Sequence, residues 1–79
     1  MDFILRVNGR LLPIQVTFTL EGTFDREVKS LTRVAKSLGA RNGLVVTWEE
    51  EDEMLIDGIA VRVVPLWKFL TGFNPFSPT

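Results

Sequence analysis

Three residues near the N-terminus have types and spacing that could support chemistry: Asp2, Gln15 and Thr17. The dipeptide at 8–9, Asn-Gly, is typical of a two-residue hairpin turn, because both of its residues accept positive φ. Such a turn puts Asp2 directly opposite Gln15, and strand alternation puts Thr17 on the same face, near the end of the second strand. A carboxylate there is a ligand type that Mg²⁺ uses, whereas a glutamine carbonyl is neutral and weaker. The cluster is therefore either an altered binding site or a set of ordinary polar residues on a half-exposed sheet face.

Composition limits the chemistry further. The 79 residues include no cysteine and no histidine, which excludes a thiolate nucleophile, a disulfide framework and an imidazole base. Hydrophobic residues make up 46% and charged residues 24% of the chain, as in a globular domain. The formal net charge of −1 gives the whole domain no general attraction to nucleic acid. No apolar run approaches the length of a membrane span, so we expect a cytoplasmic protein.

Periodicity predicts the elements that would position these residues. Alternation favours two strands around the first turn, and apolar residues at helical spacing follow. A nearly continuous apolar run is typical of a strand covered on both faces, and Asp57-Gly58 predicts a second hairpin. The expected strands are residues 2–7, 10–19, 44–48, 54–56 and 59–64, with a turn at 41–43, a long helix at 24–38 and a short helix from Pro65 to about Leu70.

This order predicts one small α/β domain over residues 1–71, followed by an irregular tail at 72–79. Its sheet would be mixed, with two hairpins and a central parallel strand reached through a strand–helix–strand crossover. The long helix would cover one face of that sheet.

The chain also resembles a known family. Its segments DFIL, NGRLLPIQVT, GLVVT, IDGI and VPLWKFL follow one another as in the nuclease-like C-terminal domain, of unassigned function, of many archaeal and bacterial P-loop ATPases. That domain is similar to the PD-(D/E)XK restriction-endonuclease-like superfamily. The resemblance covers about residues 2–70 and implies a truncated restriction-endonuclease-like fold, in which we expect the helix and strand that precede the motif in the family to be absent.

The resemblance implies a degenerate catalytic motif. Active members hold Mg²⁺ and activate water with an Asp on one strand and Asp/Glu-X-Lys on the next. The matching positions are Asp2, Gln15 and Thr17, of which only Asp2 keeps its type. Loss of two electrostatic contributors would cost roughly four orders of magnitude in rate. We therefore expect no catalytic residues, no cofactor and no metal, with Asp2 as the one weak candidate for a metal ligand.

Two charged sets complete the candidates. The acidic run 49–53 lacks the spacing of a calcium loop and is expected to be a solvated loop. The second set is basic and is expected to form either a solvated surface or a nucleic-acid-binding surface. It comprises Arg6, Arg10, Arg26, Lys29, Arg33 and Lys36.

Three functions follow, in order of preference. The first is a catalytically inactive nuclease-like domain that serves as an interaction or oligomerisation module, a split or decayed piece of an ATPase-associated protein. Its expected partners are a second copy of the chain or a P-loop ATPase, because an exposed first hairpin would invite strand pairing. The second is a nucleic-acid-binding remnant, and the third is a metal-dependent nuclease completed by a second subunit.

Overall fold

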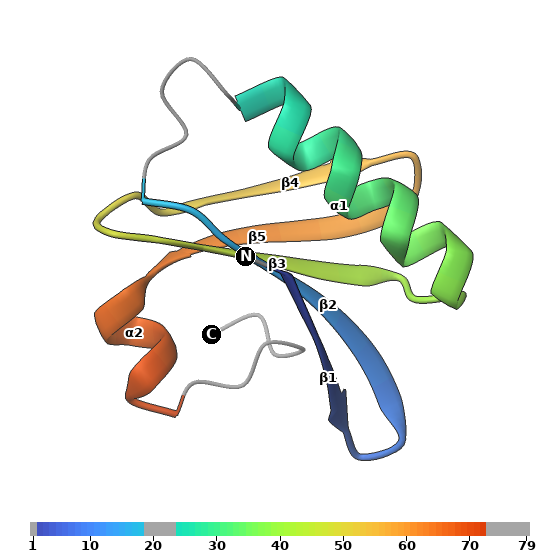
Figure 1. Ribbon diagram of the computed structural model, residues 1–79, viewed down its shortest axis with the longest axis horizontal. Helices are drawn as coiled ribbons and strands as arrows, with labels where there is room; N and C mark the ends of the chain where they lie inside the picture. Colours follow the sequence, from blue (N-terminus) through green and yellow to red (C-terminus); the bar gives the residue numbers. More distant parts are fainter. Residues whose placement is uncertain (1, 19–23, 73–79) are drawn as a thin grey trace.

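The computed structural model describes residues 2–18 and 24–72, which form one mixed sheet with two helices (Figure 1). The elements are, in chain order, β1 (Asp2–Val7), β2 (Arg10–Val16), α1 (Phe24–Leu38), β3 (Asn42–Thr47), β4 (Asp52–Ile56), β5 (Ile59–Pro65) and α2 (Leu66–Leu70). The predicted helix at 24–38 is confirmed in full. Residues 19–23 and residues 73–79 of the predicted tail lie outside the described part. Neither described helix is long and apolar enough to cross a membrane.

The five strands follow the order β1-β2-β3-β5-β4. β3 is parallel to both of its neighbours, β2 and β5, whereas β1 and β4 pair antiparallel at the two outer edges. This confirms the predicted mixed sheet with two hairpins and a central parallel strand. The two edges of the sheet are therefore β1, next to the N-terminus, and β4.

Both hairpins turn through two residues with positive φ. The φ angles are 51° at Asn8 and 80° at Gly9, and they repeat as 53° at Asp57 and 80° at Gly58. These values suit the type I′ turn that the two dipeptides predict. The first turn sets the register of β1 on β2, in which Asp2 lies opposite Gln15 as expected.

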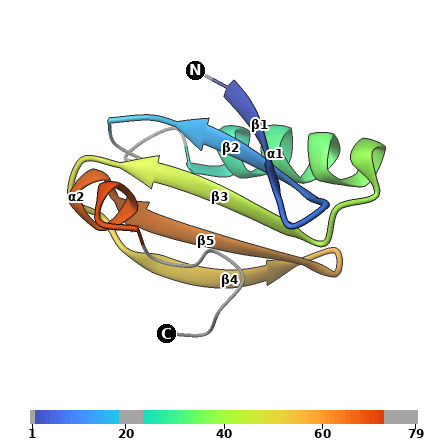
Figure 2. The same cartoon turned by 90° about the horizontal axis from the view of Figure 1, so that it is seen from below.

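The core lies on both faces of the sheet, and each face has its own helix (Figure 2). On one face, Leu31 and Ala35 of α1 pack against Val45 of β3 and the apolar residues of β5. On the other face, Leu66 and Phe69 of α2 pack beside a cluster built on β2, β3 and β5. The central strand is therefore buried on both sides, as its continuous apolar run predicted.

β3 begins earlier than the sequence indicated, because two of the three residues expected to form a turn at 41–43 are its first two residues. Asn42 and Gly43 pair with Ala60 and Val61 of β5. A side chain at Gly43 would place its Cβ 2.9 Å from Cδ2 of Leu31, so this glycine allows α1 to pack closely on the strand. The prediction of a turn here was wrong, because the glycine serves close packing rather than a reversal of the chain.

The other boundaries shift by a few residues. Asp52 and Glu53, expected in a solvated loop, are the first residues of β4, and Glu53 lies opposite Arg62 of β5. An opposed pair of unlike charges favours strand pairing and offsets the low β propensity of the acidic residues. β2 ends at Val16, so the predicted strand at 10–19 was too long. Pro65 ends β5 and caps α2 rather than opening it.

Candidate functional site

The hairpin brings two of the three motif positions together, as predicted. Asp2 and Gln15 are opposed in the register of β1 and β2. Gln15 is half-buried beneath α1, and its Nε2 donates a short hydrogen bond to Oε2 of Glu27. Thr17 is half-buried beyond the end of β2, where its backbone N–H donates to the carbonyl oxygen of Val46 at 2.9 Å. The amide at position 15 is therefore bound to a carboxylate of the protein itself.

Glu27 is a neighbour of the motif positions that was not among the candidate residues. It lies in the first turn of α1, and its carboxylate accepts the hydrogen bond from Gln15 of β2. The available signal was its spacing, because Glu27, Leu31 and Val34 follow i, i+4 and i+7 and share one side of α1. Among the residues that the structure describes, no group of three acidic, histidine or cysteine side chains could hold a metal ion.

An apolar groove runs between this side of α1 and β1, and we call it the β1 groove. Its volume is about 340 Å³. Ile4, Pro13 and Gln15 line it from the hairpin, and Leu31 and Val34 line it from α1. α1 packs on β2, β3 and β5, and Ile4 remains 56% exposed. The helix therefore leaves β1 uncovered on this face.

β1 is also apolar on its other face. Phe3 is 50% exposed and Leu5 is 43% exposed, although both belong to a regular strand. Three consecutive large apolar residues are thus open to solvent at one edge of the sheet. Natural proteins usually protect such an edge with charges, proline or a covering segment.

Pro13 determines which backbone groups of β1 remain free. Proline has no N–H, so the opposed pair Ile4–Pro13 cannot exchange two backbone hydrogen bonds. The bond from Thr17 to Val46 agrees, because it shows that the odd-numbered residues of β2 direct their backbone groups toward β3. Ile4 consequently directs its own N–H and carbonyl away from β2, toward the outside of the sheet.

The same alternation applies along the whole of β1. Asp2 and Arg6 share the orientation of Ile4, whereas Phe3 and Leu5 direct their backbone groups to β2. The outer edge of β1 therefore presents three N–H donors and three carbonyl acceptors to any strand that comes alongside.

A second apolar surface lies where the parallel strands end. A cleft of about 340 Å³ is lined by Trp48, Glu49, Leu66, Trp67 and Leu70. Strand ends of this kind often carry the ligand sites of α/β sheets.

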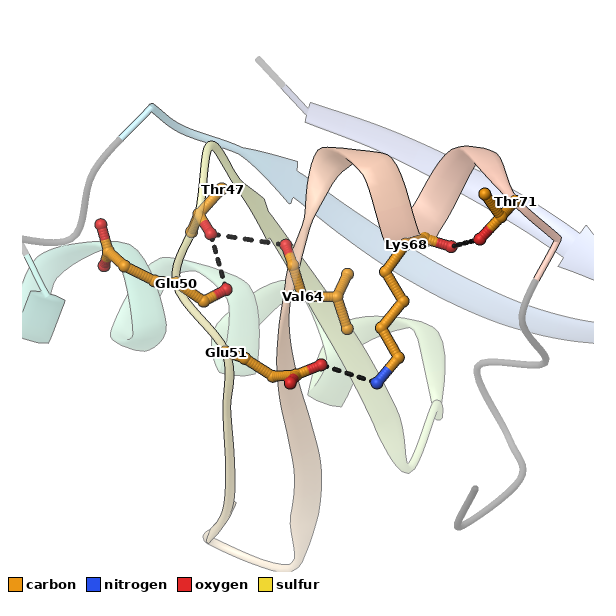
Figure 3. Close-up of polar contacts among 6 residues, drawn as sticks. All are labelled: Thr47, Glu50, Glu51, Val64, Lys68 and Thr71. Atoms are coloured by element: carbon orange, nitrogen blue, oxygen red, sulfur yellow. Dashed lines mark hydrogen bonds and ion pairs between the residues drawn. The ribbon is translucent and has the colours of Figure 1, made fainter.

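The loop beside this cleft is held by polar contacts (Figure 3). The buried hydroxyl of Thr47 donates to the carbonyl oxygen of Glu50 at 2.9 Å and lies 3.4 Å from that of Val64. Nζ of Lys68 in α2 lies 2.6 Å from Oε2 of Glu51. These contacts connect the acidic segment to α2, and they give it a structural role.

The predicted basic residues do not gather into one surface. Arg26, Lys29 and Arg33 line a depression on the exposed side of α1, together with the carboxylate-bearing Asp25. Lys36 instead forms an ion pair with Asp57 at 3.1 Å. On the hairpin, Arg6 lies opposite Leu11 and Arg10 lies opposite Val7, so the two arginines emerge on different faces of the sheet.

Comparison with known proteins adds no relative. No protein-family model, no curated protein and no solved structure matches this chain.

Proposed function

We propose that this chain is a self-association module that pairs with a second copy of itself along the edge of β1, and that it does not cleave nucleic acid. The observation that carries the proposal is the exposed edge strand, with Phe3, Ile4 and Leu5 all 43–56% exposed. Burial of such residues is favourable by roughly 1.5–3 kcal/mol for each large side chain that is fully covered.

The contrast between the two edges of the sheet supports this choice. β4 begins with Asp52 and Glu53 and directly follows three glutamates, and acidic residues of this kind disfavour pairing at an exposed edge. β1 carries one acidic and one basic residue, Asp2 and Arg6, so its own charges do not all have the same sign. Among the described residues, the outward-directed backbone groups of β1 pair with no other strand, and they suit the addition of one.

The site chemistry supports the absence of nuclease activity. Position 15 has an amide in place of a carboxylate, and that amide donates to the carboxylate of Glu27. Position 17 has a hydroxyl where the resemblance implies a lysine. The charges that would bind Mg²⁺ and stabilise a developing phosphorane are therefore reduced at both positions.

Sedimentation equilibrium over a wide range of protein concentration tests the proposal. We expect a monomer–dimer equilibrium for the wild-type chain. Ile4→Lys should raise the dissociation constant roughly tenfold or more, because it places two ammonium groups at the shared edge.

The matched control is Leu55→Lys, the same type of change at a residue of β4 that is 74% exposed. It should leave the dimer intact, and circular dichroism should show that both variants remain folded. A wild-type chain that stays monomeric at millimolar concentration would refute the proposal. A dimer that Leu55→Lys or a Trp67→Lys change disrupts, and that Ile4→Lys does not, would move the interface to β4 or to the cleft.

Nucleic-acid binding is the second candidate, and the depression lined by Arg26, Lys29 and Arg33 favours it. Three phosphate contacts would give an affinity that falls with salt with a slope of about −2 to −3 on logarithmic axes. Fluorescence anisotropy with labelled single- and double-stranded DNA at several salt concentrations measures this slope. An Arg26→Glu, Arg33→Glu double variant should abolish any such binding without changing self-association.

A further inference from the structure

We infer that the two copies pair antiparallel around a two-fold axis at Ile4, so that their sheets join into one continuous sheet of ten strands. The inference rests on the proposed function and adds the register of the contact. A closed two-fold arrangement uses the same surface on both copies, and a single edge strand can supply that surface.

The backbone selects this register. Side chains of opposed residues point to the same face of an antiparallel pair, and side chains alternate between faces along a strand. The two-fold axis must therefore lie where one residue is opposed to the same residue of the partner. With the axis at Ile4, all three outward-facing residues of β1 meet outward-facing residues of the partner, which gives three hydrogen-bonded pairs. An axis at Phe3 or at Leu5 would form only two such pairs within the strand.

The side chains favour the same register. Asp2 lies opposite the partner's Arg6 on both sides of the axis, and unlike charges at opposed positions stabilise strand pairing. Phe3 lies opposite the partner's Leu5, which is an aromatic–aliphatic pair. An axis at Leu5 would instead set Arg6 opposite the partner's Ile4. An axis at Phe3 would set Asp2 opposite the partner's Ile4, so neither register pairs the unlike charges.

The β1 groove supplies a third argument. Ile4 lines this groove together with Leu31 and Val34, and more than half of its surface is exposed. In the proposed register the partner's Ile4 lies directly beside Ile4 on the face of α1. The partner thus contributes an apolar side chain to a groove that a single copy leaves open.

Disulfide trapping tests the register, because the chain has no cysteine of its own. Single variants Phe3→Cys, Ile4→Cys and Leu5→Cys each place one thiol at a candidate axis. Opposed Cα atoms lie about 5.5 Å apart, within the range of a disulfide, whereas diagonal neighbours lie about 7–8 Å apart. Under mild oxidation we expect Ile4→Cys to form the covalent dimer at least tenfold faster than the other two variants.

Charge exchange provides a second measurement. Asp2→Arg and Arg6→Asp should each weaken the dimer roughly tenfold at low salt, because each creates two opposed pairs of like charge. The double variant restores unlike charges at the same positions, and its dissociation constant should return to within about threefold of the wild-type value.

The outcomes separate the two proposals. A wild-type chain that never dimerises defeats the proposed function and this inference together. A dimer that is trapped fastest by cysteine at position 3 or 5, or that the double charge variant does not restore, defeats the register alone. Reduced samples of each cysteine variant, measured by sedimentation, show whether the substitution itself has changed the affinity.

Discussion

At the scale of single residues, the contact between Gly43 and Leu31 decides how closely α1 approaches the sheet. Leu31 is 3% exposed, so its side chain has little room to move away from an added methyl group. The sequence showed the glycine but could not show this role, because glycine also signals turns and neighbouring Asn42 strengthened that interpretation.

Gly43→Ala should therefore lower the free energy of unfolding by about 1–3 kcal/mol through overpacking. Leu31→Ala alone should cost about 2–5 kcal/mol, because it leaves a cavity. The double variant should cost less than the two single losses together, since the new methyl group occupies part of that cavity. Urea denaturation of the three variants measures this coupling, and strict additivity would show that the two residues do not meet.

The pair formed by Gln15 and Glu27 leads to a second prediction at this scale. Gln15→Glu removes the amide donor and sets two carboxylates against each other, which should cost about 1–3 kcal/mol. The exchange Gln15→Glu with Glu27→Gln restores one amide and one carboxylate and should recover most of the loss. Thermal unfolding at constant pH and salt compares the variants. A double variant no more stable than Gln15→Glu would show that the contact is not specific.

At the scale of elements, the two hairpins and the long helix could be predicted because each has a local signal. Asn8-Gly9 and Asp57-Gly58 set the turns, and the apolar spacing of 24–38 set the helix. The start of β4 could not be predicted in the same way, because Asp52 and Glu53 are poor strand formers. Their place in the strand depends on β5, whose Arg62 lies opposite Glu53.

The candidate site likewise has features that a local sequence signal predicts and features that depend on tertiary packing. The opposition of Asp2 and Gln15 follows from the turn alone and was predicted correctly. An exposed first hairpin was also expected, whereas the partner of Gln15 and the β1 groove depend on where α1 lies over the sheet. That position is a tertiary property, which the periodicity of the helix does not specify.

The orientation of the β1 backbone can be tested by two proline variants. Ile4→Pro removes an N–H that points outward, so β1 should stay paired with β2 and stability should fall by no more than about 1 kcal/mol. Leu5→Pro removes an N–H that points toward Leu12 and should cost about 3 kcal/mol or more. Amide hydrogen exchange and urea denaturation measure both effects. Equal damage from the two variants would show that the inferred orientation is wrong.

At the scale of the whole molecule, composition bears on whether the chain could cleave nucleic acid. The sequence has no histidine to act as a general base, and its net charge of −1 does not attract a polyanion. We expect no divalent-dependent cleavage of plasmid, linear or single-stranded DNA with Mg²⁺ or Mn²⁺, at any concentration at which the dimer forms. A chelator and an Asp2→Ala variant serve as controls. Cleavage that Asp2→Ala abolishes would instead support a nuclease completed by a second subunit.

Among the strands that the structure describes, β1 pairs with β2 alone. A strand with a single neighbour at the edge of a sheet is among the first parts of a protein to open. Pairing with a second copy would give β1 a neighbour on each side, and mass action would then link opening to assembly. The melting temperature should consequently rise with protein concentration, and amide protection should increase most at the outward-facing residues of β1. A dilute sample would have a loosely held β1 that is open to proteases, whereas a concentrated one would protect that strand through assembly.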